Sequence, residues 1–389
     1  VRPFFYAMAG NDFVFGSELR YVIAYFKDNP ALRPDYLLDT LVTSKSAKDM
    51  TPYEGIFRLK PGHVLTCSGG SVGTEQYWQE DPGKTIRFSQ ETEYVQYFRE
   101  KLIQAVTMRC TGVRGLGTEL SGGLDSSAVT GIAADFAASE NRSLTAFSNI
   151  FPAGTGVEFK DEREFIDDMI THKRVNWVGV DRLNQPLTDL LEHTIDIQGC
   201  FVQQNFNIFN RGIYEAAGQQ GIPVLLSGFG GDELVSARIS LPWNELIREG
   251  QWKVMANELF YNGITLKALL KPARIAGRYL YSCLYKPEFR TGVFTPELLG
   301  RRFTNLPLQS DFATLHNLRQ RLDEKFRMPH QEKLAWRQYS QILMDHLPQR
   351  MEYCYTAAAQ YGVEYRYPLL DTDLMETCLA FPPWVKQHH

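Results

Sequence analysis

Two different periods of hydrophobic and polar residues follow one another along the chain. In the first 85 residues, short apolar runs are separated by turns rich in Gly and Pro, a pattern typical of antiparallel strands. An acidic, proline-containing stretch, Glu80–Lys84, then leads into a helical period that starts at about Glu91. Because 389 residues exceed what one core usually serves, we predict two domains, residues 1–85 and 86–389. Within the first, strands are predicted over 4–8, 13–16, 55–59 and 63–67.

The second part alternates predicted strands with predicted helices. Such alternation is typical of a parallel sheet covered by helices on both faces. The predicted fold class is therefore α/β: an N-terminal antiparallel β domain, then a parallel-sheet domain with an α-rich C-terminal part. Strands are expected over 116–120, 143–150, 177–180 and 223–227, and helices over 91–108, 126–139, 161–172, 184–195 and 205–219, with helical patterns dominating from 241 to 371.

The run Leu120–Ser127 forms a turn between a predicted strand and a predicted helix. Gly122 and Gly123 let the backbone approach an anion, and the helix N-terminus brings unpaired N–H groups, so a phosphate group is the expected ligand of this turn. A carboxylate in this turn would repel phosphates unless a cation lay between them, which makes Asp125 a candidate Mg²⁺ ligand. A plain turn with a helix N-cap is the alternative for any short piece of this run. Hydroxyl groups come from Ser121, Ser126 and Ser127.

A second Gly-rich turn, Ser227–Glu233, follows the predicted strand at 223–227. In open α/β sheets, ligands bind at the carboxyl ends of the strands, so both turns belong to the expected ligand edge. Asp232 then becomes a second candidate metal ligand, although an isolated Asp-Glu pair is more often a solvated one.

Three segments in this order resemble the asparagine synthetase family of ATP pyrophosphatases. The run SGGLDSS at 121–127 resembles the family's pyrophosphate loop, and SGFGGDE at 227–233 its SGxGxDE signature. The segment Val363–Asp371 is similar to the family's E-x-R-x-P-F-L-D motif. The resemblance implies an ATP-dependent reaction in which a carboxylate substrate, an amino acid or a peptide, becomes an acyl-adenylate and is then attacked by an amine donor.

The resemblance also implies roles for particular residues. Asp125 and Asp232 would hold Mg²⁺ on the pyrophosphate of ATP, and Arg366 and Lys386 are candidates for neutralising charge, Arg366 being the preferred one. The family's usual catalytic lysine lies beyond its third motif, in a portion that this chain does not clearly contain. Asp161–Glu162 resembles a family D-E pair, or complements a helix dipole. The expected nucleotide contacts are Leu120, Ser121, Gly122, Gly123, Asp125, Ser126, Ser127, Ser148, Asn149, Gly228 and Phe229.

The N-terminal part resembles the back half of a class II glutamine amidotransferase domain. The similar segments are Val1–Tyr6, Phe15–Leu19, Arg58–His63 and Tyr77–Trp78. The nucleophile of such domains is an N-terminal cysteine, which would precede Val1, and we therefore expect a leading piece to be missing. His63 falls in a structural turn of the matched pattern and is not expected to be catalytic.

Phe229 departs from the family pattern, because asparagine synthetases carry a glutamate at the middle of SGxGxDE. Phenylalanine accepts no proton, so the base must lie elsewhere or the pocket must suit another acid. A lasso-peptide cyclase, with a precursor peptide and a leader-binding partner, is one alternative; a catalytically silent ATP-binding homologue is another. A group of basic and aromatic residues could bind such a peptide, or could simply form a solvent-exposed helix face. These residues are Trp252, Tyr261, Lys267, Lys271, Arg274 and Arg278.

Charge and cysteine content narrow the function further. A net charge of −4 gives no global attraction to nucleic acid or to anionic membranes. The six cysteines are scattered without metal-ligand spacing, which is typical of reduced thiols in a cytoplasmic protein. No apolar run approaches the roughly 20 residues of a membrane span. We therefore expect a cytoplasmic enzyme with ATP and Mg²⁺ and with neither nucleic-acid nor membrane partners.

Overall fold

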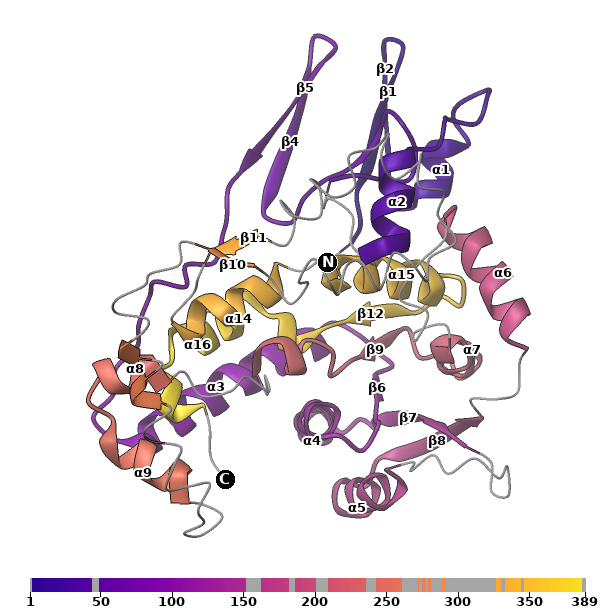
Figure 1. The fold of residues 1–389 in the computed structure, drawn as a ribbon. Helices are drawn as coiled ribbons and strands as arrows, with labels where there is room; N and C mark the ends of the chain where they lie inside the picture. Colours follow the sequence, from indigo (N-terminus) through magenta and orange to yellow (C-terminus); the bar gives the residue numbers. More distant parts are fainter. Residues whose placement is uncertain are drawn as a thin grey trace. The chain divides into compact units, whose positions relative to one another are not determined.

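A computed structural model describes most of the chain (Figure 1). The described residues are 2–43, 49–151, 162–181, 186–200, 209–235, 243–260, 272, 275–277, 279–280, 289–291, 327–329, 333–343 and 346–386. They pack as two units. The first comprises 1–79, 99–236 and 344–375, and the second 80–98, 237–343 and 376–389.

The N-terminal residues form two small antiparallel sheets, as the alternating pattern predicts. Strand β1 (Phe5–Ala9) lies between β2 (Asp12–Gly16) and β3 (Ile56–Arg58). A separate hairpin pairs β4 (His63–Ser68) with β5 (Ser71–Gln76). The sequence reasoning missed β5 and two helices, α1 (Leu19–Ile23) and α2 (Pro34–Thr43). One buried cluster of this region consists of Phe5, Ala7, Leu19, Val22 and Ile56.

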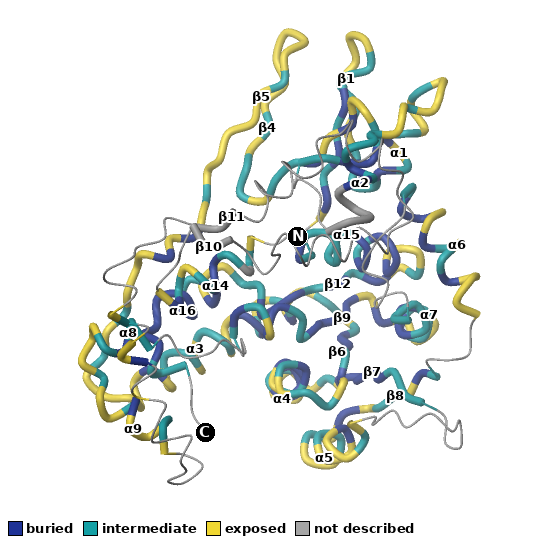
Figure 2. Tube along the Cα trace, viewed as in Figure 1, coloured by how far each residue is buried: buried dark blue, intermediate teal, exposed yellow. Residues whose placement is uncertain are grey.

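A five-stranded parallel sheet forms the centre of the first unit. Its strand order is β12-β9-β6-β7-β8, and every pairing is parallel. Strand β9 is apolar and buried in all three positions, as expected of a strand with helices on both faces of its sheet. Figure 2 shows this burial along the sheet. The strands are β6 (Gly117–Glu119), β7 (Thr145–Ile150), β8 (Asn176–Asp181), β9 (Val224–Leu226) and β12 (Glu364–Arg366).

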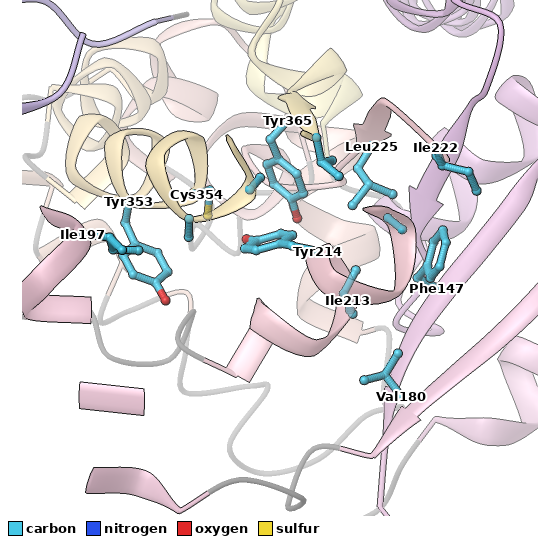
Figure 3. Packing of buried hydrophobic residues seen from close by; sticks show 14 of the residues in the cluster. Phe147, Val180, Ile197, Ile213, Tyr214, Ile222, Leu225, Tyr353, Cys354 and Tyr365 are labelled. Atoms are coloured by element: carbon cyan, nitrogen blue, oxygen red, sulfur yellow. The ribbon is translucent and has the colours of Figure 1, made fainter. Parts of the chain in front are cut away.

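Helices pack on the two faces of this sheet (Figure 1). One face is covered by α4 (Leu124–Ser139) and α5 (Arg163–Lys173). The other is covered by α7 (Arg211–Gln219) and α15 (His346–Ala359), with α6 (Leu187–Gln198) beside α15. A large buried cluster fills this second face, in which the rings of Tyr214 and Tyr365 pack edge to face with centroids 5.4 Å apart (Figure 3).

The C-terminal region is rich in helices, as expected, and also contributes three short strands among the described residues. Strand β12 extends the parallel sheet next to β9, and Phe289–Thr291 (β10) pairs with Arg327–Pro329 (β11). Strand β12 has only three residues, which is too short for a hydrophobic period to reveal. The other elements are α3 (Glu91–Cys110), the π-helical turn η2 (Gly231–Val235), α8 (Trp243–Arg248), α9 (Trp252–Phe260), α14 (Leu334–Ile342), η3 (Pro368–Leu370), α16 (Thr372–Ala380) and η4 (Pro383–Val385).

Within the described residues, no helix combines the length and the apolar character that a bilayer crossing requires. The five cysteines of those ranges are free thiols.

Candidate active site

The first Gly-rich turn connects β6 to α4 and is held by its own hydroxyl groups. The Ser126 hydroxyl donates to the Gly123 carbonyl over 3.0 Å and accepts from the Ser121 amide over 3.2 Å. Gly122 has a φ of +91°, and a Cβ added there would lie 2.6 Å from Cβ of Glu162. Gly123 occupies the N-cap position of α4 without a side-chain cap. The turn therefore presents the uncapped N-terminus of a buried helix at the carboxyl edge of the sheet, as predicted for an anion seat.

The second Gly-rich turn packs directly against the first. A Cβ added to Gly228 would lie 2.6 Å from the amide nitrogen of Ser126, and one added to Gly231 would collide with the Asp125 carboxylate. Gly230 has a φ of +102° and lies against Leu370 of η3. The three segments that the sequence analysis singled out thus meet at one edge of the sheet, and glycine is required where they touch.

The two candidate metal ligands lie on either side of this contact. Asp125 is in the first turn of α4 with its carboxylate against Gly231, and Asp232 is the next residue of η2 and is exposed. Among the described residues, no group of three or more His, Cys, Asp or Glu side chains forms a ready metal cage. Two carboxylates of this kind suit Mg²⁺, which usually takes one or two protein carboxylates and completes its shell with phosphate oxygens and water.

A buried polar network ties the strand ends together behind the turns. Glu119, the last residue of β6, accepts a hydrogen bond from Nδ2 of Asn210 over 2.6 Å and one from the Ser227 hydroxyl over 3.0 Å. Asn210 in turn accepts from Nδ2 of Asn149 over 2.9 Å, and Ser227 accepts from the Phe229 amide over 3.2 Å. Glu119 therefore links three strands and the second turn, a role that the sequence analysis did not assign to it.

The surroundings of Glu119 offset only part of the effect of its burial, and its pKa stays raised. Burial raises the pKa of Glu119, and Tyr365, Arg350 and Ser227 oppose that shift. The Tyr365 hydroxyl acts on the carboxylate although its geometry falls short of a well-formed hydrogen bond.

Helix α15 brings two further side chains to the second turn, and the sequence analysis missed both. The guanidinium of Arg350 lies 3.9 Å over the ring centroid of Phe229. His346, one helical turn earlier, lies 3.0 Å from Oε1 of Glu233 in η2. Both residues stand on the same face of α15, because positions four apart on a helix are neighbours.

Several predicted nucleotide contacts have side chains that serve the scaffold. The Ser148 hydroxyl donates to the Leu120 carbonyl over 2.5 Å and accepts from the Trp177 indole over 3.0 Å. Leu120 is buried, and its amide donates to the Phe147 carbonyl. These residues lie at the edge where the nucleotide is expected, so any contact with it would come from their backbone groups.

The two cations proposed from the sequence lie in different surroundings. The guanidinium of Arg366, in β12, donates to both carboxylate oxygens of Glu364 and to the Arg109 carbonyl, over 2.7 to 3.3 Å. These contacts occupy its fork, so the geometry gives its catalytic role no support. Lys386 belongs to the second unit, where its ammonium donates to Oε1 of Gln338 over 2.7 Å. Burial lowers the pKa of Lys386 to about 8.

The remaining predicted residues fall partly inside and partly outside the described ranges. Glu162 is described and packs against Gly122, and Trp252 is exposed at the start of α9. His63 begins β4, and its Nδ1 lies 2.9 Å from the Pro61 carbonyl, as expected of a structural turn. Outside the described residues lie Asp161, Tyr261, Lys267, Lys271, Arg274 and Arg278.

Comparisons with known proteins agree with the arrangement of these motifs. The chain is 26% identical over 245 residues to "Amidase chyE" of Penicillium rubens, which covers 60% of this chain and 36% of the relative. It is 34% identical over 138 residues to asparagine synthetase (glutamine-hydrolyzing) 3 of Bacillus subtilis, covering 34% of this chain and 22% of that protein. "Amidase chry2" of Gibberella zeae is 24% identical over 245 residues, covering 60% of this chain and 36% of its own length. The chain thus spans about a third or less of these relatives.

Two family models match the chain in sequence order. The glutamine amidotransferase domain matches residues 1–78, the part that carries the antiparallel sheets. The asparagine synthase model matches residues 97–389, which include both Gly-rich turns and the segment around β12. The chain therefore belongs to the asparagine synthase family.

Proposed function

We propose that this chain forms amide bonds in an ATP-dependent, AMP-forming reaction. One carboxylate oxygen of the acid substrate attacks the α-phosphorus of ATP, the bond to the bridging oxygen breaks, and pyrophosphate leaves. The nitrogen of an amine then attacks the acyl carbon, AMP leaves, and the amine proton passes to solvent. The observation that supports this proposal is the contact of the two Gly-rich turns at Asp125, because the start of α4 and the residues Asp125 and Asp232 all belong to these turns.

Each part of the site has a physical task in this reaction. The uncapped start of α4 binds phosphate oxygens through backbone N–H groups. Asp125 and Asp232 would hold Mg²⁺, which when bound neutralises the negative charge that grows on the leaving pyrophosphate. Glu119 holds the second turn in place through Ser227. Gly228 and Gly231 let the two turns pack together, because a Cβ there would meet the backbone of Ser126 or the Asp125 carboxylate.

Isotope exchange between pyrophosphate and ATP tests the first half of the reaction. Exchange must depend on ATP, Mg²⁺ and a carboxylic acid, and Asp125→Asn should slow it by about 100-fold or more, as expected for loss of a transition-state contact. Asp135→Asn is the matched control, because Asp135 is on the same helix but is largely exposed and pairs with Lys173 over 2.8 Å. Equal exchange in the two variants would contradict the metal assignment.

The amine donor is the second part of the proposal. The amidotransferase match over residues 1–78 supports ammonia from glutamine as the donor. Product formation with ammonium chloride in place of glutamine would be expected, since the synthetase half needs only the amine.

A peptide amine is the alternative donor, as in a lasso-peptide cyclase acting with a precursor peptide and its leader-binding partner. Phe229 favours this alternative. The second turn carries an aromatic ring, covered by Arg350, at the position where asparagine synthetases have a glutamate that would bind a small ammonium group. A product joined to a peptide N-terminus would identify this branch. Tight ATP binding without any exchange would instead identify a silent homologue.

A further inference from the structure

Arg350 stands out among the charged side chains of the first unit because its guanidinium is stacked but not paired. It covers the ring of Phe229 at 3.9 Å, and Tyr367 packs against the same ring with centroids 5.9 Å apart. Its Nε atom is buried and has no hydrogen-bond partner among the described residues. A side chain of intermediate exposure whose Nε is buried without a hydrogen-bond partner in the described part of the chain is a candidate ligand-binding group.

The nearby carboxylates do not take up the Arg350 fork. Both oxygens of Glu119 are engaged, one by Asn210 and one by Ser227, and Glu233 is bound by His346. Neither forms an ion pair with Arg350 within 4.0 Å in the described part of the chain. Within the described residues, the Arg350 cation is therefore balanced over a distance, by Glu119 among others.

The position of this fork relates it to the reacting groups. Phe229 lies between Gly228, which touches the backbone at the start of α4, and Gly230, which touches η3. The Arg350 guanidinium therefore covers a residue that is next in sequence to Gly228, where the two turns touch. A planar fork matches a carboxylate with two parallel hydrogen bonds, and the ring beneath keeps it in that plane.

We propose that Arg350, supported by Phe229, is the specificity-determining residue for the acid substrate and binds a carboxylate that is not the one activated. The preferred substrate is then a dicarboxylic acid without an ammonium group beside Arg350. A zwitterionic amino acid is disfavoured because the guanidinium repels its ammonium group, and the oxygens of Glu119 that could attract it are already engaged. This inference rests on the proposed synthetase activity and names the class of acid that it uses.

Pairs of acids that differ only in an ammonium group test the inference. Exchange of pyrophosphate with ATP is measured with succinate against aspartate and with glutarate against glutamate. The wild-type protein should prefer the dicarboxylic acid of each pair by about 10-fold or more in kcat/KM, as expected for a buried charge contact. Arg350→Gln should raise the KM for the dicarboxylic acid by about 10-fold, while the KM for MgATP changes by less than about 2-fold.

Two more variants separate recognition from folding. Arg350→Lys keeps the charge and should restore part of the acid affinity, and Arg350→Glu should shift the preference towards the amino acid of each pair. Arg20→Gln is the matched control, because the Arg20 guanidinium also covers an aromatic ring, that of Tyr21 at 4.8 Å, but is far from either Gly-rich turn in the sequence. Unchanged binding of MgATP by each variant, measured by calorimetry, shows that the site is folded.

Three results would overturn the inference while leaving the proposed function intact. The first is a wild-type preference for the amino acid of each pair. The second is that another carboxylic acid supports exchange while none of the four probe acids does. The third is an Arg350→Gln variant whose KM for the dicarboxylic acid is unchanged. A rise in the KM for MgATP alone would make Arg350 a phosphate ligand and would also overturn it. If the wild-type protein supports no exchange with any carboxylic acid, the proposed function is contradicted. That result is independent of the Arg350 variants.

Discussion

Helix α15 carries two charged side chains two residues apart, Arg350 and Glu352, and their surroundings differ. Towards the N-terminal sheet, Oε1 of Glu352 lies 2.5 Å from Nε of Arg58, with side chains only 13% and 8% exposed. Towards the second Gly-rich turn, Arg350 has a ring beneath it and no ion pair within the described residues. The first charge is paired within the protein, whereas the second has no ion pair among the described residues and, in our proposal, pairs with a bound acid.

This difference separates a structural charge from a functional one. Burial raises the pKa of Glu352, and the neighbouring Arg58 guanidinium opposes that shift, so the pair is stable only as a pair. The pair fixes α15 on β3, and α15 then holds Arg350 and His346 at the second turn. Changes on the first side should therefore alter the free energy of unfolding, and changes on the second side should alter ligand binding.

The largest expected effect is on the paired side. Arg58→Met leaves Glu352 buried without its partner and should lower the free energy of unfolding by about 3 to 5 kcal/mol. The double variant Arg58→Met/Glu352→Leu should recover most of that loss, because no buried charge is left. Urea denaturation measures both. Lys60→Met is the control, since its pair with Asp49 is 42% exposed on each side and is worth about 0 to 1 kcal/mol.

A loss of less than about 1 kcal/mol in Arg58→Met would contradict this view. It would mean that water reaches Glu352 and that the two sides of α15 differ less than the distances indicate.

The next effect concerns the contact between the two turns. In Gly231→Ala the new methyl group would strike the Asp125 carboxylate, so either the carboxylate or η2 must move. The expected cost is about 1 to 3 kcal/mol in stability and about 100-fold in affinity for MgATP, as for other small displacements of reacting groups. Gly73→Ala in β5, where an added Cβ meets nothing within 4 Å, is the control. Equal MgATP affinity in both would show that Asp125 is not held by this turn.

The parts that the sequence predicts well are those whose structure is local. The first turn, from Leu120 to Ser127, is held by its own serines, so its residue types are enough to recognise it. The parallel sheet follows from alternating strands and helices. By contrast, β12 is only three residues long, and its neighbour β9 lies well over one hundred positions away in the chain.

The second turn depends on tertiary contacts and therefore could be predicted only in part. Its glycines and Asp232 are visible in the sequence, but Arg350 and His346 come from a distant helix whose pattern gives no sign of a ligand site. Glu119 looks like an ordinary strand residue until Asn210 and Ser227 are seen to bind it. The catalytic role of Arg366, taken from its motif, stays a prediction, and its observed contacts are with Glu364 and the Arg109 carbonyl.

A smaller effect is expected for stability when Arg350 is changed. Arg350→Gln removes a charge that has no ion pair within the described ranges, which stabilises the fold, and also removes the stacking on Phe229, which costs about 0.5 to 2 kcal/mol. The two terms offset, so the free energy of unfolding should change by less than about 1 kcal/mol, within the range of ordinary substitutions. Thermal denaturation without ligand measures it. A loss as large as that of Arg58→Met would show that the two sides of α15 are both structural.

The smallest effect is a change in pH dependence at Glu233. Burial would raise the pKa of Glu233, but its contacts with His346, its own backbone and Arg350 outweigh burial and lower the pKa below the usual 4.5. An acid whose pKa is lowered by folding contributes stability above its unfolded pKa and loses it as the pH falls through the folded value. Wild-type stability should therefore fall below about pH 4.5, and Glu233→Gln should fall less there, by under about 1 kcal/mol. Urea denaturation at pH 7 and pH 4 measures the difference, and Glu75→Gln in β5 is the exposed control. If Glu233→Gln and the wild-type protein lose the same stability between these pH values, the His346 contact holds no charge, and Arg350 is the only group on this face of α15 whose charge matters.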